Sequence, residues 1–409
     1  MVVLAFSELG EPVHELDCVR EARKPELLLE RAAVLGPFLR ARHKPSMPTD
    51  VLRCVPMRWA LLVLVVAGVC ASAHAAATRG SKAPTLGELV GQRLVVAMRG
   101  QMPSVSLLAR IRAGEVGGVV LFLRNVRDRS QVRTLTAALQ AAARTGGRPT
   151  LLIAVDQEGG ATRRFSWAAP SLSAAQLGRL TPSAVESQGK AAAEALVDVG
   201  VNVDLAPVAD VPSVPGAFIA AQERAFSASP TRVAMLATAF AQGLHDGGVA
   251  ATAKHFPGLG RARVSTDVAA VTLTATRDAF DSDLLPYGRL IASAVPLVML
   301  SNATYPALDA KPAAWSPAVE SLLRRTLGFT GVTITDALDA AGPTHGRSVA
   351  SAAVLSAQAG ADLLLVTGSE AASGDVYDRL LAAAEAGRIS RRNFERSYAR
   401  ISALKQSVA

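Results

Sequence analysis

The sequence predicts an α/β protein with a single (β/α)8 barrel of the TIM type. Eight apolar, β-branched runs alternate with helical stretches rich in Ala and Leu from about Leu86 onward. Several runs are apolar throughout, which is typical of parallel strands covered on both faces. A doubly wound open sheet is the alternative. It would need a glycine-rich nucleotide loop after the first strand, and the segment 98–101 is not one.

The strands and helices follow from this alternation. The expected strands are 93–98, 118–123, 151–155, 201–205, 251–255, 297–301, 332–335 and 362–366. The helices expected between them include 130–144, 182–199, 230–246, 276–292, 317–326, 349–359 and 374–386. Thr181-Pro182 and Ser229-Pro230 are typical of an N-cap followed by proline at the first helical position. Gly247-Gly248 ends the helix that begins near Pro230.

The first 75 residues are not expected to belong to the barrel. Residues 57–75 start with Met57-Arg58, continue as an apolar run and end at Ala73-His74-Ala75, which is typical of a secretory signal peptide. We expect a non-native or disordered extension at 1–56 and the catalytic domain at 82–409. The expected location is secreted or in the cell envelope, with membrane contact only through an uncleaved signal-like segment. The alternative is a cytoplasmic N-terminal region with a membrane anchor at 60–77.

Composition narrows the classes of partner. The formal net charge is +9, but the Arg residues are scattered and no basic run is interleaved with aromatics, so nucleic acid is not an expected partner. All three cysteines precede residue 76, and no zinc-type Cys/His pattern is present. We expect no cofactor and no metal, because Asp156 with Glu158 is too small a set of ligands. A monomer is expected.

Polar residues gather directly after the expected strands, and in a barrel these positions form the active mouth. They are Arg124-Asn125, Asp156 to Gly160, Asp210, Lys254-His255, Ser301-Asn302 and Asp336. A purely structural role is open for several of them. Asp210 can cap the turn that follows it, and Gln157 and Glu158 can be hydrogen-bonded supports that do not touch a substrate.

Six ordered segments resemble glycoside hydrolase family 3, and within it the β-N-acetylglucosaminidases (β-N-acetylhexosaminidases) that act on cell-wall peptidoglycan sugars. They are 118–125, 155–160, 200–208, 223–226, 254–258 and 331–338. The resemblance extends from about Leu86 to Leu404. It implies a retaining glycosidase with a carbohydrate substrate, an amino-sugar glycoside.

The resemblance also implies roles for individual residues. Asp336 matches the catalytic nucleophile of the family. Asp156, Arg224, Lys254 and His255 match residues that bind the hydroxyl groups of the sugar at the cleaved bond. These residue types suit the chemistry, because a retaining glycosidase needs a carboxylate to attack the anomeric carbon and a second group to protonate the leaving oxygen. Lys254 would also favour the ionised form of Asp336.

The sequence departs from the family at the proton donor. Family members carry an Asp-His dyad after the fifth strand, and here Ser265 and Asp267 occupy those two positions, while Leu259 replaces another histidine. Three outcomes stay open. Asp267 can act as the acid, another residue such as His345 can serve, or the protein can bind sugar with little or no hydrolysis. A phosphorylase-like activity is a further, minor alternative.

Overall fold

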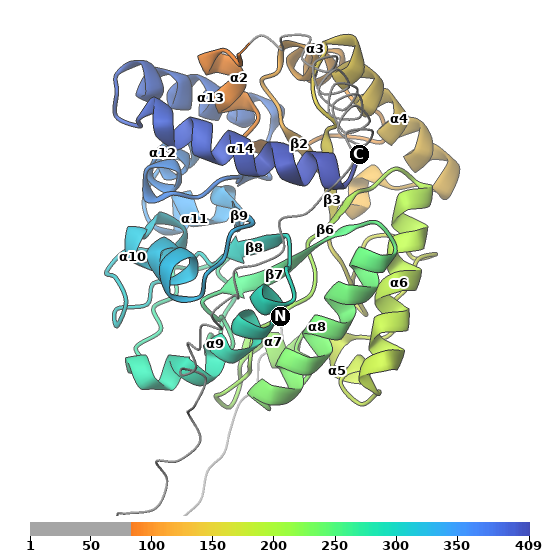
Figure 1. Ribbon diagram of the computed structural model, residues 1–409, viewed down its shortest axis with the longest axis vertical. Coiled ribbons are helices and arrows are strands. Elements are labelled where there is room, and N and C mark those ends of the chain that lie inside the picture. Colours follow the sequence, from red (N-terminus) through yellow and green to blue (C-terminus); the bar gives the residue numbers. More distant parts are fainter. Residues whose placement is uncertain (1–82) are drawn as a thin grey trace, which may run out of the picture. The chain divides into compact units, whose positions relative to one another are not determined.

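The computed structural model describes residues 83–409 (Figure 1). The expected extension at 1–56 and the signal-like segment at 57–75 lie outside these residues. None of the helices in the described part is long and apolar enough to cross a membrane.

A parallel sheet of eight strands forms the centre of the domain. Its strands are β1 (Leu94–Ala97), β2 (Gly118–Leu121), β3 (Leu152–Val155), β6 (Val203–Asp204), β7 (Ala250–Phe256), β8 (Leu297–Leu300), β9 (Val332–Thr335) and β10 (Leu364–Val366). The order is β10-β1-β2-β3-β6-β7-β8-β9, and every pairing in this sheet is parallel. A bridge between Ile334 and Leu363 joins β9 to the segment before β10, so the ring closes. The (β/α)8 barrel is confirmed.

Each expected strand coincides with a strand of the barrel. The fourth is the shortest, since β6 covers only Val203 and Asp204. Backbone pairing with β3 nevertheless continues one residue beyond each end of β6, because the amides of Asn202 and Leu205 donate to carbonyl groups of β3. A small antiparallel hairpin of β4 (Gln157–Gly159) and β5 (Thr162–Arg163) follows β3.

Helices surround the barrel (Figure 1). They are α2 (Leu86–Gly91), α3 (Val105–Ala113), α4 (Arg129–Thr145), α5 (Ala174–Leu177), α6 (Pro182–Asp198), α7 (Phe218–Ala221), α8 (Pro230–Asp246), α9 (Arg277–Ala292), α10 (Pro317–Ser321, continued by a π-helical turn at Leu322–Thr326), α11 (Leu338–Thr344), α12 (Val349–Ala359), α13 (Glu370–Glu385) and α14 (Arg391–Ser407). Thr181 and Ser229 cap α6 and α8 as expected, each with proline in the first turn. Helix α13 begins four residues earlier than expected, because the Ser369 hydroxyl accepts the amide of Ala372.

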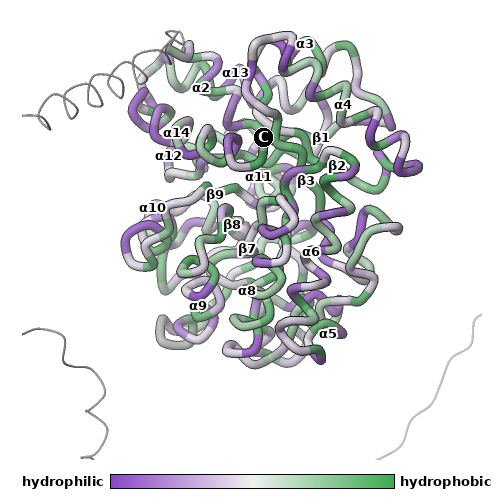
Figure 2. Tube along the Cα trace, turned by 45° about the vertical axis from the view of Figure 1, so that its right-hand side comes forward, coloured by the Kyte–Doolittle hydropathy of each residue, from purple (hydrophilic) through white to green (hydrophobic). Residues whose placement is uncertain are grey.

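Two apolar layers hold the barrel together, and the strands form the hydrophobic centre in Figure 2. One side of each strand packs against the helices, and the other fills the interior with residues such as Val95, Leu152 and Ile334. Ile401 and Leu404 of α14 join the interior cluster. Helix α14 therefore closes the amino end of the barrel.

The amino end also contains a buried ionic network. Asp362, fully buried just before β10, accepts Arg324 Nη2 at 2.6 Å and Arg400 Nη2 at 2.6 Å. Arg93, also buried, donates from Nε to the Asp362 carbonyl at 3.1 Å. Both guanidinium partners of the Asp362 carboxylate are largely shielded from solvent, so this network links α14 and α10 to the strand ends beneath them.

Candidate active site

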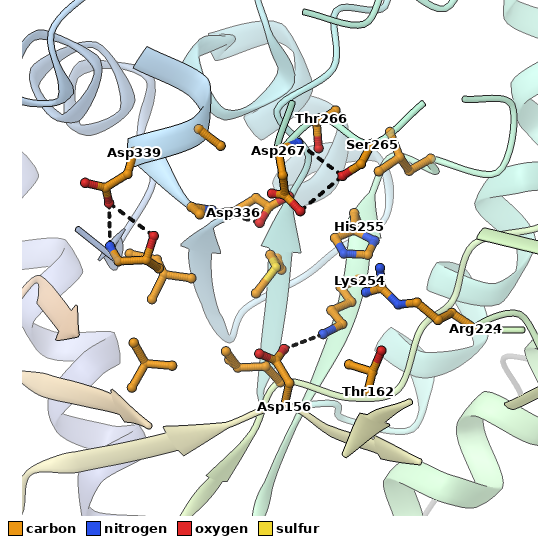
Figure 3. A pocket seen from close by; sticks show the side chains of 18 of the residues that line it. Asp156, Thr162, Arg224, Lys254, His255, Ser265, Thr266, Asp267, Asp336 and Asp339 are labelled. Atoms are coloured by element: carbon orange, nitrogen blue, oxygen red, sulfur yellow. Dashed lines mark hydrogen bonds and ion pairs between the residues drawn. The ribbon is translucent and has the colours of Figure 1, made fainter. Parts of the chain in front are cut away.

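A cavity of about 460 Å³ opens at the carboxyl end of the barrel (Figure 3). All six residues that the sequence singled out line it: Asp156, Arg224, Lys254, His255, Asp267 and Asp336. They come from segments up to 180 residues apart in the chain, since Asp156 follows β3 and Asp336 follows β9. The parallel strands bring them together because all their carboxyl ends meet at one edge.

Lys254 is the central cation of the cavity. Its side chain is buried, and Nζ lies 2.8 Å from Asp156 Oδ1 and 2.7 Å from Glu158 Oε1. Arg164 approaches the other oxygen of Asp156 at 3.3 Å. Burial alone would raise the pKa of Asp156, but the charges of Lys254 and Arg164 outweigh it and hold that pKa below its usual range. Asp156 is therefore an ionised hydrogen-bond acceptor in the wall of the cavity.

Glu158 holds two of the cations of the cavity, Arg224 and Lys254, in place. Its oxygens accept Arg224 Nε and Nη2, both at 2.8 Å, in addition to Lys254. Burial opposes ionisation of Glu158, yet Arg224 and Lys254 lower its pKa far below the usual range. The sequence left a supporting role open for both Gln157 and Glu158. Glu158 has this role, because it fixes the Arg224 and Lys254 side chains that line the cavity.

His255 is oriented from behind by Asp210. Asp210 is fully buried, and its Oδ2 lies 2.7 Å from His255 Nδ1. Its Oδ1 accepts the backbone amides of His255 at 3.1 Å and Leu259 at 2.7 Å, and the Tyr287 hydroxyl at 3.3 Å. Asp210 thus binds residues distant in the sequence, at His255, Leu259 and Tyr287, rather than capping the turn that follows it. The carboxylate favours a proton on Nδ1 of the ring.

Asp336 stands at the junction of β9 and α11. Its backbone amide donates to the Leu300 carbonyl at 2.9 Å, which continues the strand pairing, and its Oδ1 accepts the Ala337 amide at 2.7 Å. Burial raises the pKa of Asp336, His255 opposes the rise, and Asp267 adds to it. The side chain projects into the middle of the cavity in Figure 3.

The loop after β7 carries the altered proton-donor motif. Its Asp267 faces Asp336 in Figure 3, and its influence on the pKa of Asp336 reflects that proximity. The Ser265 hydroxyl donates to Asp267 Oδ2 at 3.0 Å and accepts the Asp267 amide at 3.1 Å. Leu259, at the site of a family histidine, is buried in the cavity wall. Asp267 is exposed, so it can exchange protons with solvent.

His345, the other candidate acid, is placed differently. It follows the last residue of α11, its Nε2 lies 3.2 Å from the Asn302 carbonyl oxygen, and its ring packs edge-on against Trp315. It is not among the residues that line the cavity. Proximity along the chain to Asp336 suggested His345, but its ring contacts Asn302 and Trp315 and does not line the cavity.

The sequence interpretation overlooked two residues beside the cavity. Arg164, at the end of the β4–β5 hairpin, reaches back to Asp156. Asp204, the last residue of β6, is fully buried, and burial raises its pKa to about 8. Its Oδ1 accepts the Gln157 amide at 2.9 Å, and within residues 83–409 its buried Oδ2 has no hydrogen-bond partner. The strand-end rule gave no signal for Asp204, because this residue lies inside the expected strand 201–205.

Comparison with known proteins agrees with this geometry. Residues 85–404 match the glycosyl hydrolase family 3 N terminal domain. The chain belongs to this family. It is therefore a glycosidase that hydrolyses O-glycosyl compounds, and its substrate is a carbohydrate.

Relatives of this family 3 glycosidase include bacterial and fungal enzymes. A secreted glycosyl hydrolase of Arthroderma benhamiae is 36% identical over 78% of this chain and 93% of its own length. A β-hexosaminidase of Pseudomonas aeruginosa is 37% identical over 64% of this chain and 78% of its own. The structure of a family 3 β-N-acetylglucosaminidase from Paenibacillus sp. str. FPU-7 superposes with a TM-score of 0.75 at 34% identity. That alignment covers 80% of this chain and 63% of the Paenibacillus chain, which is the longer of the two.

Proposed function

We propose that this family 3 glycosidase is an exported β-N-acetylglucosaminidase of the cell-wall type that retains anomeric configuration. The position of Asp336 carries this proposal: a carboxylate in the middle of a sugar-sized cavity, flanked by residues suited to bind hydroxyl groups. The amino-sugar preference is supported by the likeness to the Pseudomonas and Paenibacillus enzymes. Export is supported by the signal-like segment 57–75 and by the secreted Arthroderma relative.

In the first step, the sugar ring is held by its hydroxyl groups. Asp156 accepts hydrogen bonds from them, while Lys254 and Arg224 donate. Since Glu158 and Asp156 already fix both cations, little reorganisation is needed when the sugar binds. These charged contacts can tighten as the ring flattens and gains positive charge at the anomeric carbon.

In the second step, an Asp336 oxygen attacks the anomeric carbon and forms a glycosyl ester as the bond to the leaving oxygen breaks. Asp267 donates its proton to that oxygen. Water then attacks the anomeric carbon, the C–O bond to Asp336 breaks, and Asp267 takes the proton from the water. Asp336 returns as a carboxylate and Asp267 as an acid, so the cycle is complete without any further reactant.

Two substitutions test these roles on nitrophenyl glycosides and on a natural disaccharide. Asp336→Asn abolishes cleavage of both. Asp267→Ala slows the natural disaccharide by about 10²–10⁴-fold but slows nitrophenyl glycosides much less, because a good leaving group needs little protonation. Equal losses on the two substrates would remove Asp267 from the acid role. Equal inactivity of wild type and Asp336→Asn, with sugar binding intact, would leave a binding protein instead.

A further inference from the structure

The loop that carries Asp267 consists of a stem held by the barrel and a tip that is mostly exposed. This proton-donor loop spans residues 257–270, directly after β7. In the tip, residues 263–268, the side chain and the amide of Asp267 both form hydrogen bonds with Ser265 of the tip itself. The position of Asp267 relative to Asp336 therefore depends on how the stem is held.

The stem, residues 257–262, is fixed against neighbouring loops of the barrel. The Tyr305 hydroxyl, fully buried, donates to the Gly258 carbonyl at 3.0 Å. Gly260 lies so close to another backbone segment that a Cβ at this position would come within 1.8 Å of the Val211 carbonyl oxygen. Such contacts leave the backbone of the stem little freedom to move.

Arg261 ties the stem to helix α9 by an ion pair. Its Nε lies 2.9 Å from Asp283 Oδ2, and its guanidinium lies over the Phe280 ring, 5.8 Å from the ring centroid. The Asp283 side chain is only 2% exposed, and that of Arg261 is largely shielded. A charge-assisted hydrogen bond between shielded groups has a defined geometry, and removal of one partner leaves the other charge buried.

The same face of α9 also acts on the sugar-binding side of the cavity. Phe280, Asp283 and Tyr287 are spaced by three and four residues, so they lie on one face of the helix. The Tyr287 hydroxyl donates to Asp210 Oδ1 at 3.3 Å, and Asp210 Oδ2 lies 2.7 Å from His255 Nδ1. One helix face thus supports both His255 and the stem of the proton-donor loop.

We propose that Arg261, through its ion pair with Asp283, is a positioning residue that holds Asp267 within hydrogen-bond reach of the leaving oxygen. Without the ion pair, the stem loses its attachment to α9, and Asp267 is less often placed for proton transfer. Asp336 follows β9 and does not belong to the loop, so its attack on the anomeric carbon is largely unaffected. The inference rests on the proposed function, because it takes Asp267 as the proton donor.

The test measures Arg261→Gln on two substrates, N,N′-diacetylchitobiose and a nitrophenyl N-acetylglucosaminide. On the disaccharide, kcat/KM should fall about tenfold or more, since complete loss of a general acid costs about 10²–10⁴-fold. On the nitrophenyl glycoside it should change by about twofold or less, because this leaving group needs little protonation. Arg261→Lys keeps the cation and should recover part of the loss. A purely structural role would lower both rates equally.

Two further variants separate the positioning role from stability. Arg261→Gln leaves Asp283 buried without this cation, so the double variant Arg261→Gln/Asp283→Asn removes both charges and protects folding. It should show about the same loss on the disaccharide as Arg261→Gln, because both variants remove one and the same ion pair. Arg110→Gln breaks a partly shielded ion pair with Glu115 that does not line the cavity, and it should leave the ratio of the two rates unchanged.

The outcomes that contradict the inference are distinct from those that contradict the proposed function. Equal losses on both substrates, or an unchanged disaccharide rate in both Arg261 → Gln backgrounds, would overturn the positioning role while Asp336-dependent cleavage of the nitrophenyl glycoside persists. Failure of wild type to cleave the nitrophenyl glycoside would overturn the proposed function, and the positioning role with it.

Discussion

Both ends of this barrel contain a buried carboxylate held by two cations, but of the two networks only the one at the carboxyl end faces the cavity of the candidate site. At the carboxyl end, Glu158 binds Arg224 and Lys254, and both cations line a cavity of about 460 Å³. At the amino end, Asp362 binds Arg324 and Arg400 beneath α14. The difference shows that a buried ion network marks function only where its charges also meet a space that a ligand can enter.

The largest expected effect lies at the carboxyl end. Asp336→Asn should lower kcat on an activated glycoside by about 10⁴-fold or more, as removal of a nucleophile does in other enzymes that form covalent intermediates. Because burial raises the pKa of Asp336, its ionised form costs stability above the ordinary carboxyl pKa, so the variant should melt at the same or a higher temperature at neutral pH. A loss of both activity and thermal stability would show that Asp336 has a structural role.

A matched pair of substitutions tests the comparison directly. Asp362→Asn and Glu158→Gln each neutralise a carboxylate between two cations, and each should cost about 3–5 kcal/mol of unfolding free energy. Only Glu158→Gln should also lower kcat/KM, by about 10²-fold, because it releases side chains that position the sugar. Urea unfolding and glycosidase assays on the folded fraction separate the two. Equal activity losses would mean that the two networks do not differ in function.

A smaller effect is expected behind His255. Asp210→Asn keeps an acceptor for the amides of His255 and Leu259 but replaces the carboxylate oxygen at Nδ1. We expect kcat/KM to fall about tenfold. The ¹⁵N chemical shifts of the His255 ring should report a change of tautomer. If activity falls while the ring signals stay unchanged, Asp210 acts through the loop at Leu259 rather than through the histidine.

The smallest effect is a shift in pH dependence. In the free enzyme the negative charge of Asp267 contributes to the raised pKa of Asp336, and the proposed proton donor is the form of Asp267 that has taken up a proton in the complex with the sugar. Because kcat/KM reports the free enzyme, Asp267→Asn should lower the pKa of Asp336 and move the acid limb of kcat/KM to lower pH, by about one pH unit or less. An activated nitrophenyl glycoside keeps the variant measurable. Added salt should reduce the shift, since Asp267 is exposed. A limb that moves to higher pH would contradict the arrangement of the two carboxylates.

Local sequence patterns predicted most of the fold. Continuous apolar runs bounded by turn residues placed all eight barrel strands, and serine or threonine before proline placed the starts of α6 and α8. Helix α14 was missed because its sequence is rich in charge and its apolar residues are few. Its role as the cover of the barrel depends on Ile401 and Leu404 meeting an apolar opening that no local pattern describes.

The candidate site likewise combines residues that the sequence predicted with contacts that only the structure shows. The cavity positions of Asp156, Lys254, His255 and Asp336 were predictable, because each lies at or directly after the carboxyl end of a strand and matches a family segment. Their supporting contacts were not. The interaction between Asp210 and His255 joins residues 45 positions apart.

By itself, the sequence determined the succession of strands and helices, the family, and the residue types available at each strand end. Those properties depend on short-range periodicity and on the chemistry of single side chains. Only the tertiary structure decided which of these groups face one cavity, which carboxylate orients a neighbour, and which ion network is sealed. These outcomes depend on distances and burial that arise only when the parallel strands close into a ring.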